Sequence, residues 1–278
     1  MTAPRRPPLR YHGGKWRLAP WLLKHFPPHV CYVEPYGGGA SVLLRKPQSY
    51  LEVYNDIDGE VVHFFRVLRE RTEEFTQAVR LTPFSREELD LAYLDCDNPL
   101  ERARRFYVRA WQGRGGPRAQ WKTGWRFQIS DARGKRSVDD WNDTRHLRGI
   151  VERLKNVQIE CGEALRVIER YDKPETLYYL DPPYPAETRS KRWRRRAYQY
   201  EMTTEDHGRL AGVLHDIEGM AIISSYRSKL YDDLYAHWSR TCTETQTDGK
   251  TKRVECIWLN QAAQLARYPL FAALRETA

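Results

Sequence analysis

The strongest chemical signal is the run Asp181-Pro182-Pro183-Tyr184, which directly follows an apolar stretch rich in Tyr and Leu. Two consecutive prolines at the end of a strand impose a rigid, extended turn. A carboxylate, a backbone carbonyl and an aromatic ring therefore arrive together at the carboxyl end of a predicted strand, where open α/β sheets bind their ligands. A purely structural turn is the alternative interpretation. We interpret Asp181, Pro182, Pro183 and Tyr184 as catalytic.

This set of groups suits chemistry on the exocyclic amine of a nucleobase. Such an amine is a poor nucleophile, because its lone pair is delocalised into the ring. Hydrogen-bond acceptors for its two N–H groups favour a pyramidal nitrogen with an available lone pair, and Asp181 and the Pro182 carbonyl are the natural acceptors. Tyr184 would stack on the base. Reaching such a base in duplex DNA requires flipping it out of the helix.

A second signal is the run Glu34-Pro35-Tyr36-Gly37-Gly38-Gly39, which follows the first predicted strand. Glycines at this place let a ligand approach the backbone closely, although a tight turn without a ligand is an equal alternative. The run is not the dinucleotide fingerprint. Asp56 ends the next predicted strand, where an acidic residue can bind ribose hydroxyls. The pair predicts a site for an adenosine-containing cofactor.

A third signal is the N-terminal run Tyr11-His12-Gly13-Gly14-Lys15. It is not a phosphate-binding P-loop, because the earlier glycine is missing and Trp16 replaces Ser or Thr. Lys15 can still neutralise a ligand carboxylate. A basic turn without a ligand is the alternative interpretation.

Apolar runs and helical periodicity predict the elements that position these groups. Strands alternate with helices in the first 70 residues and again after residue 150, which is typical of a parallel α/β sheet. Predicted strands are 30–34, 50–54, 157–161, 176–180 and 220–225, with an antiparallel hairpin of 238–243 and 253–259; predicted helices are 40–45, one after Asp58, 85–94, 99–111, 164–171 and 203–217, the last with Thr203 as N-cap and Asp206 three residues on. Residues 72–150 interrupt this alternation and read as an insertion.

Composition limits the class of protein. The 278 residues are 41% hydrophobic, which argues for a folded chain. No apolar run approaches the roughly 20 residues that span a bilayer, and the N-terminus lacks the apolar segment of a signal peptide. The five cysteines show no paired spacing and the eight histidines no metal-ligand spacing, so we expect reduced, mostly buried thiols and no metal.

The net charge of +9 is concentrated in two basic segments. Residues 100–127 carry eight basic side chains and one acidic one, and residues 189–196 carry six basic and none acidic. For 189–196, phosphate contacts around a flipped nucleotide are the functional interpretation, and a solvated charged loop is the alternative. Residues 113–127 read as a DNA-contacting loop, whereas the stretch from Arg102 to Arg109 could be only a solvated helix face. The predicted DNA-binding residues are Arg114, Arg118, Lys122, Arg126, Arg189, Lys191, Arg192, Arg194, Arg195 and Arg196.

Taken in order, these blocks resemble the D12-class, Dam-like N6-adenine DNA methyltransferases. The resemblance covers nearly the whole chain, and the blocks fall at the family's spacing: Tyr11-His12-Gly13-Gly14-Lys15, Glu34-Pro35-Tyr36-Gly37-Gly38-Gly39, Asn55-Asp56-Ile57-Asp58, Asp181-Pro182-Pro183-Tyr184 and Glu201-Met202-Thr203-Thr204-Glu205-Asp206-His207. It implies a Rossmann-like S-adenosylmethionine-dependent methyltransferase sheet with helices on both faces. It also implies a mainly helical inserted target-recognition subdomain at 71–150, between catalytic segments 1–70 and 151–278.

The resemblance further implies S-adenosylmethionine as methyl donor, with S-adenosylhomocysteine as product. The cofactor-binding residues would be Tyr11, Lys15, Glu34, Pro35, Gly37, Gly39, Asp56, Glu163 and Asp181. Glu163 departs from the family, which often has Asp at that position, where it contacts the cofactor adenine. The basic run after Tyr184 is a second departure.

The expected function is thus transfer of a methyl group to N6 of a flipped adenine in double-stranded DNA, by a cytoplasmic monomer without metal. Cytosine-N4 methylation uses the same geometry and remains an alternative, as does a non-catalytic DNA-binding protein with a vestigial cofactor fold. Cytosine-C5 methylation is disfavoured because no Pro-Cys block exists. Protein glutamine methylation is disfavoured because related sites carry Asn in place of Asp181. The sequence leaves open whether a restriction-modification partner exists.

Overall fold

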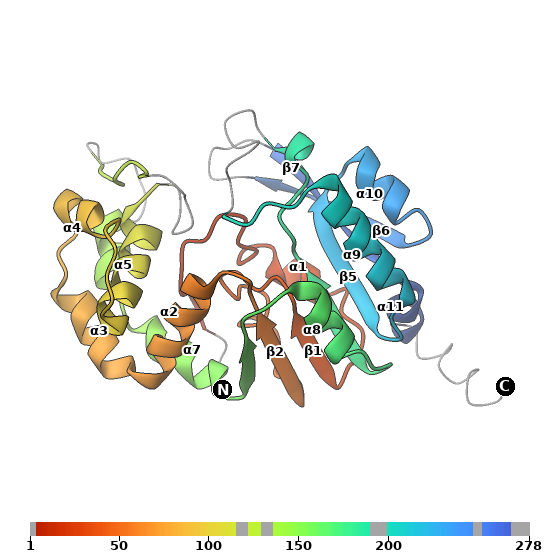
Figure 1. Cartoon of the computed structure of the whole chain (residues 1–278), viewed down its shortest axis with the longest axis horizontal. Helices are drawn as coiled ribbons and strands as arrows, with labels where there is room; N and C mark the ends of the chain where they lie inside the picture. The colour runs from red at the N-terminus through yellow and green to blue at the C-terminus, as the bar shows by residue number, and fades with distance from the viewer. Residues whose placement is uncertain (1–3, 115–121, 129–135, 190–198, 247–251, 268–278) are drawn as a thin grey trace.

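A seven-stranded sheet forms the centre of the computed structural model, which describes residues 4–114, 122–128, 136–189, 199–246 and 252–267 (Figure 1). The strand order is β3-β2-β1-β4-β5-β7-β6. Strands β1 to β5 pair in parallel, whereas β7 is antiparallel to both β5 and β6. The strands are β1 (Cys31–Glu34), β2 (Leu51–Asn55), β3 (Val157–Glu160), β4 (Thr176–Leu180), β5 (Met220–Tyr226), β6 (Ser239–Gln246) and β7 (Lys252–Leu259). The α/β prediction and the antiparallel hairpin are confirmed.

Helices cover both faces of this sheet, because its strands are apolar on both sides. Along β4, Tyr178 and Leu180 face a core formed with α8 (Ala164–Arg170), α9 (Thr204–Asp216) and α10 (Lys229–Leu234). Leu177 and Tyr179 face the opposite core, which includes residues of α1 (Ala19–Leu23), α2 (Gly59–Glu70), α7 (His146–Leu154) and α11 (Gln261–Ala266). Successive strand residues point to opposite faces, so each strand supplies both cores.

A group of helices lies beside the sheet, at the left of Figure 1. It comprises α3 (Thr72–Leu81), α4 (Arg86–Leu91), α5 (Pro99–Gln112) and α6 (Ser137–Asn142). Their aromatic side chains pack together, with the rings of Phe75 and Tyr107 5.7 Å apart and those of Tyr107 and Trp141 5.6 Å apart. These side chains belong to the same continuous core as Tyr54 of β2 and Leu177 of β4. The hydrophobic core of the sheet therefore continues into the helical region.

The start of α9 follows the predicted capping pattern. The backbone N–H of Asp206 donates to the Thr203 hydroxyl at 3.2 Å, and the backbone N–H of Thr203 donates to the Asp206 carboxylate at 2.8 Å. Two N–H groups at the end of the helix are thereby satisfied by side chains. These two hydrogen bonds fix the first residue of α9 and the position of the Asp206 side chain.

The helix predicted at 40–45 is wrong. Residues 38–45 form consecutive turns instead. Gly38 and Ala40 both have positive φ, 49° and 53°, and this left-handed backbone cannot start a right-handed helix. The glycine-rich run therefore reaches the next strand through a folded loop.

The prediction of five reduced, mostly buried thiols is also wrong. Cys242 of β6 and Cys256 of β7 lie opposite each other in the strand register and form a disulfide. Of the other three cysteines, Cys31 is buried, Cys96 is half-buried and Cys161 is exposed. The 14-residue separation carries no motif, and only the hairpin register brings the two sulfur atoms together.

Candidate functional site

One cavity of about 280 Å³ collects all the residues predicted to bind the cofactor. Its walls are loops that follow the carboxyl ends of β1, β2, β3 and β4, together with the N-terminal segment and the chain around the start of α9. The predicted residues that line it are Tyr11, Lys15, Glu34, Pro35, Gly37, Gly39, Asp56, Glu163 and Asp181. Segments separated by up to 170 residues thus converge on one site, as expected at the carboxyl edge of a parallel sheet.

The glycine-rich loop is shaped by two close approaches. A Cβ atom on Gly37 would lie 2.2 Å from the Tyr54 ring, and one on Gly38 would lie 2.7 Å from the Tyr11 ring. The Gly38 N–H donates to one oxygen of Asp56 at 2.8 Å, and the Asp58 N–H donates to the other at 2.9 Å. The loop therefore holds the Asp56 carboxylate at the wall of the cavity.

Asn55 joins three strand ends, and the sequence interpretation did not single it out. Its amide nitrogen donates to the carbonyl oxygens of Pro35 and Gly162, at 2.8 and 3.0 Å. Its amide oxygen accepts the Gly162 N–H at 2.9 Å. Because Asn55 is fully buried, these bonds fix the mutual positions of the loops that follow β1, β2 and β3.

Lys15 and Asp181 form an ion pair at the centre of the site. The Lys15 Nζ lies 2.8 Å from Oδ1 and 2.9 Å from Oδ2 of Asp181, and it also donates to the Gly13 carbonyl at 2.9 Å. The Ser224 hydroxyl, from β5, donates to Asp181 Oδ1 at 3.0 Å. Ser224 is a further residue that sequence reasoning missed. The Lys15 ammonium and the Ser224 hydroxyl together orient the Asp181 carboxylate.

Tyr184 lies behind Asp181 and is almost fully buried. Its hydroxyl donates to the Glu255 carboxylate, and its ring centroid is 4.7 Å from the Lys15 ammonium. Arg189, predicted to contact DNA, donates to the Tyr184 carbonyl and, at 2.6 Å, to Glu201. Its side chain is only 6% exposed, so in this structure it braces the turn after β4.

Glu34 lies at the floor of the cavity and is 3% exposed. The Tyr32 hydroxyl donates to its carboxyl group at 2.6 Å. Burial raises the pKa of Glu34 to about 8, against the opposing effect of the Tyr32 hydrogen bond. The carboxyl group is therefore protonated in the folded protein at neutral pH.

We expect Glu34→Gln to remove a specific dependence of stability on pH. A raised folded-state pKa means that the contribution of protonated Glu34 is complete below the unfolded carboxyl pKa and is lost as the pH rises through about 8. Relative to the variant, the wild-type free energy of unfolding should fall by on the order of 1 kcal/mol per pH unit between those two pKa values. Urea unfolding from pH 5 to pH 9 measures the difference. Glu169→Gln, on the exposed side of α8, is the control, and parallel curves for wild type and Glu34→Gln would contradict the assignment.

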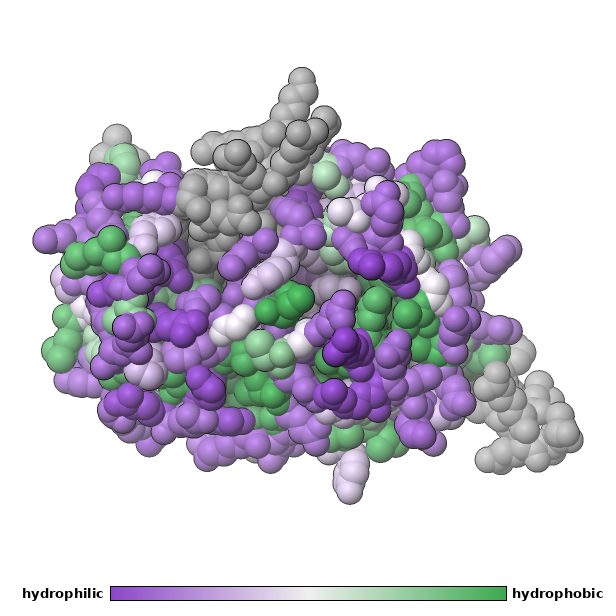
Figure 2. All heavy atoms as spheres, viewed as in Figure 1, coloured by the Kyte–Doolittle hydropathy of each residue, from purple (hydrophilic) through white to green (hydrophobic). Residues whose placement is uncertain are grey.

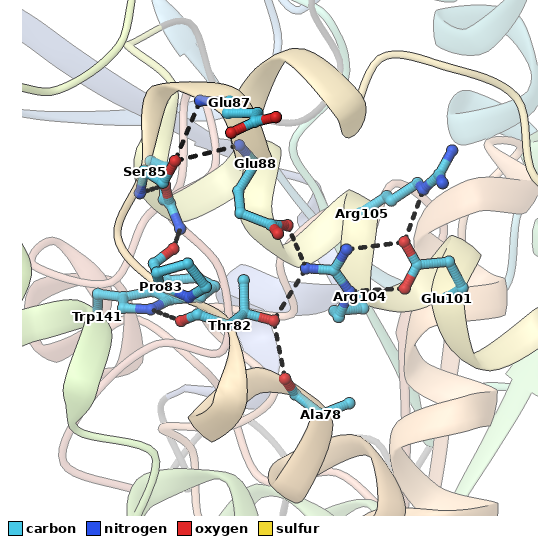
Figure 3. Close-up of polar contacts among 11 residues, drawn as sticks. Ala78, Thr82, Pro83, Ser85, Glu87, Glu88, Glu101, Arg104, Arg105 and Trp141 are labelled. Carbon is cyan, nitrogen blue, oxygen red and sulfur yellow. Dashed lines mark hydrogen bonds and ion pairs between the residues drawn. The ribbon is translucent and has the colours of Figure 1, made fainter.

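Most arginines on α5 are matched by acidic side chains. Figure 3 shows Arg104 between Glu101 and Glu88, with N–O distances of 2.6 and 2.8 Å. Arg105 pairs with Glu101 at 2.8 Å, and Arg102 pairs with Glu60. This part of the basic segment therefore belongs to a charge network within the protein, and Arg104 is only 12% exposed, unlike an arginine on a solvated helix face.

The remaining DNA-binding predictions divide into two groups. Arg114 donates to the Trp125 carbonyl at 3.1 Å, Arg126 donates to the Gly113 carbonyl at 2.7 Å, and Lys122 lies 2.8 Å from Asp90. An isolated antiparallel bridge between Gly113 and Trp125 holds this segment together. The other predicted residues, Arg118, Lys191, Arg192, Arg194, Arg195 and Arg196, lie outside the described residues.

The cavity also has apolar walls that sequence reasoning did not identify. They are formed by Ile57, Ala164, Leu165 and Met202. Ile57 is 44% exposed. Ile57 and Met202 lie inside two of the motif blocks, but no role was predicted for either, and Ala164 and Leu165 follow Glu163 without a motif of their own. Together with Asp56 they offer one face for an apolar ring and one acceptor for hydroxyl groups.

Within the described part of the chain, no group of three or more His, Cys, Asp or Glu side chains is arranged to hold a metal ion. No helix there is long and apolar enough to cross a membrane. Figure 2 shows that hydrophilic residues cover most of the viewed face and that hydrophobic ones gather mainly in its central part.

Comparison with known proteins gives one family. Residues 11–110 and 126–249 match the model of the D12 class N6 adenine-specific DNA methyltransferases. A DNA adenine methylase of Salmonella typhi is 27% identical over 183 residues, and that of Escherichia coli K12 is 26% identical over 187 residues. In both cases the match covers 63% of this chain and 64% of the relative. The Type II methyltransferase M.MjaIII of Methanocaldococcus jannaschii is 21% identical over 265 residues, covering 83% of this chain and 88% of the relative.

Proposed function

The chain belongs to the D12 class of N6 adenine-specific DNA methyltransferases, and from this premise we propose that it methylates N6 of a flipped adenine in double-stranded DNA. The mixed α/β fold with its seven-stranded, mostly parallel sheet is consistent with a methyltransferase fold. The observation that carries the proposal is the placement of Asp181 in the cavity. There the side chain sits next to the rigid Pro182-Pro183 turn and in contact with Lys15 and Ser224.

The residues around the cavity fit S-adenosylmethionine, the methyl donor that the family implies. Asp56 offers an acceptor for ribose hydroxyls, and Ile57 and Leu165 offer apolar contacts for a purine ring. Glu163 also lines the cavity, and in this proposal its carboxylate takes the place of the Asp that the family often has there. Lys15 and Tyr11 line the same cavity. Bound here, the cofactor would supply an electrophilic methyl group and leave as S-adenosylhomocysteine.

The chain's own groups then prepare the target amine. Asp181 accepts one N–H of the adenine amine and the Pro182 carbonyl accepts the other, which favours a nitrogen with an available lone pair. Asp181 need not be a strong base, because the proton can leave after the new N–C bond has formed. If the Tyr184 ring becomes exposed as the base enters, the ring can stack on the purine. The contacts of Lys15 and Ser224 orient the carboxylate before the amine binds.

The helical region beside the sheet supplies the surface for target recognition in this proposal. Residues 71–150 would form the recognition part, and residues 1–70 and 151–278 the catalytic part. The match to the family model breaks between residues 110 and 126, within the helical region. Arg114 and Arg126 lie at the edges of that break. Arginine is the side chain best suited to reading the edge of a guanine base, so both are candidates for base contacts. In this proposal the protein acts on DNA as a monomer in the cytoplasm.

We expect the purified protein to transfer tritiated methyl groups from S-adenosylmethionine to unmethylated duplex DNA. Mass analysis of the product nucleosides should show N6-methyladenine. DNA that already carries the methyl group at the target adenines is the matched control and should accept no label. N4-methylcytosine would instead identify the cytosine as the target. Absence of both label and cofactor binding would reject the enzymatic proposal.

A further inference from the structure

Strand β7 brings a second carboxylate, that of Glu255, into the centre of the site. Glu255 is 4% exposed and lies opposite Tyr226 of β5 in the strand register. It accepts the hydroxyl hydrogen bond of Tyr184, and its Oε1 atom lies 3.8 Å from the Lys15 ammonium. Both partners belong to the site described above, although Glu255 itself lies more than 70 residues after the Asp181 block.

A buried carboxylate is costly unless it is paired and hydrogen-bonded. A hydroxyl such as that of Tyr184 could be satisfied by a backbone carbonyl or an amide, without burying a charge. Glu255 instead reaches both the tyrosine and the ammonium. Its place therefore calls for an explanation beyond filling space between two strands.

Lys15 sits between the two carboxylates. Its Nζ is 2.8 Å from Asp181 Oδ1 and 3.8 Å from Glu255 Oε1. A shift of the ammonium by about an ångström would turn the longer contact into a hydrogen bond of ordinary length. The lysine can thus pass from one carboxylate to the other without leaving the site or becoming uncompensated.

We propose that Glu255 is a positioning residue for methyl transfer: it fixes the Tyr184 ring through its hydroxyl and takes up the Lys15 ammonium when Asp181 accepts the target amine. The inference rests on the proposed function, because it assigns a role within the same reaction. Without Glu255, an amine bound to Asp181 would have to compete with Lys15 for the same oxygen atoms. With Glu255, the Lys15 ammonium has a second partner, so more of the Asp181 carboxylate is available to the target amine.

The pH dependence of the reaction reports this role. Burial raises the pKa of Glu255, and the nearby Lys15 opposes that effect. As the pH falls through this raised pKa, Glu255 takes up a proton and no longer attracts the ammonium, so turnover should fall. The titratable groups that face it are Lys15, Tyr179, Asp181, Tyr184 and Tyr226.

The test compares Glu255→Gln with wild type. The glutamine keeps the shape and the acceptor for Tyr184 but removes the charge. We expect kcat to fall on the order of 10- to 100-fold, as for a misplaced reacting group, while the Kd for S-adenosylhomocysteine, measured by calorimetry, stays within about twofold. The fall of wild-type kcat at low pH should be absent from the variant. Glu244→Gln, on the exposed side of the neighbouring strand β6, is the matched control and should behave as wild type.

Three further measurements keep the test decisive if Glu255→Gln is poorly folded. Glu255→Asp retains the charge and should keep the acid limb of the pH profile. In the ligand-free protein, the stability difference between wild type and Glu255→Gln should shrink as the pH rises, because a raised carboxyl pKa favours folding only while the group is protonated. Tyr184→Phe combined with Glu255→Gln should cost less than the sum of the two single changes.

The outcomes separate the two proposals. Wild-type protein that transfers no methyl group would reject the proposed function and this inference with it. Wild-type transfer together with an unchanged kcat and an unchanged pH profile in Glu255→Gln would overturn the inference alone. Equal loss of cofactor binding and turnover in a folded Glu255→Gln protein would also overturn it, since that pattern belongs to a residue that maintains the cofactor cavity.

Discussion

Replacing Asp181 by alanine should strongly slow methyl transfer while leaving the affinity for duplex DNA largely intact. The carboxylate is the acceptor that aligns the target amine, and Lys15 and Ser224 hold it in place. Loss of one preorganised hydrogen-bond partner of a reacting group costs on the order of 100- to 1,000-fold in rate. Single-turnover methylation at saturating cofactor measures this loss directly, and a filter-binding assay on the same DNA measures the affinity.

The controls for this variant follow from the geometry. Asp181→Asn keeps the shape of the side chain but removes the charge that pairs with Lys15, so it should retain folding and lose most of the rate. Asp233→Ala removes an exposed carboxylate of α10 that pairs with Lys229 and should leave the rate unchanged. Near-normal turnover in Asp181→Ala would contradict the assignment of the catalytic site. Loss of DNA binding in step with turnover would show that the residue supports the DNA surface instead.

The sequence predicted those parts of the site that follow strands with clear boundaries. Strand β4 begins and ends at the predicted residues, Thr176 and Leu180, because an apolar run is followed at once by Asp181 and two prolines. The N-cap at Thr203 was predicted because its partner Asp206 lies three residues away. Both signals are local, so no knowledge of tertiary packing was needed.

The residues that were missed depend on pairing between distant segments. Glu255 reaches Tyr184 only because β7 inserts between β5 and β6, and Cys256 meets Cys242 through the same hairpin. Ser224 reaches Asp181 because β5 lies beside β4. No spacing in the chain encodes these meetings, since they follow from the order of strands in the sheet.

The charge pattern shows the same distinction. Counted along the chain, the arginines of α5 belong to a segment of eight basic side chains and one acidic one, which places a positive surplus in the proposed recognition part. In the structure Arg102 pairs with Glu60, which belongs to α2, and Arg104 pairs with Glu88, which belongs to α4. Charge that is balanced in space contributes little to phosphate binding. The surplus available for DNA therefore depends on where acidic side chains from other elements lie, which a count within one segment cannot show.

The largest expected loss of stability comes from Arg153→Met. Arg153 of α7 donates to both oxygens of Glu52, one of them at 2.8 Å, and to the Leu43 carbonyl at 2.9 Å. Glu52 of β2 is fully buried and also accepts from Lys46 at 2.6 Å. Removing one partner of a buried ion pair typically costs about 3–5 kcal/mol, because the other charge stays buried with fewer partners. Urea unfolding at pH 7 should show a loss in that range.

Lys155→Met is the matched control, because Lys155 lies two residues further along and pairs with Glu152 at an exposed site. Exposed pairs contribute at most about 1 kcal/mol, so this variant should remain close to wild type. Equal stability of the two variants would contradict the account of the buried network. The double variant Arg153→Met with Glu52→Gln should be more stable than the sum of the single losses predicts, since it no longer buries an underpaired charge.

The pH dependence of this network has the opposite sign to that of Glu34. Burial alone would raise the pKa of Glu52, but the hydrogen bonds from Arg153 and Lys46 bring it below its ordinary value. The stabilisation is therefore present above the unfolded carboxyl pKa and is lost as the pH falls through the lower folded value. In Arg153→Met this acid sensitivity should decrease. Because Glu52 lies in the strand that ends at Asn55 and leads into Asp56, the network anchors the strand that delivers both residues to the cavity, and its loss should weaken cofactor binding as well as the fold.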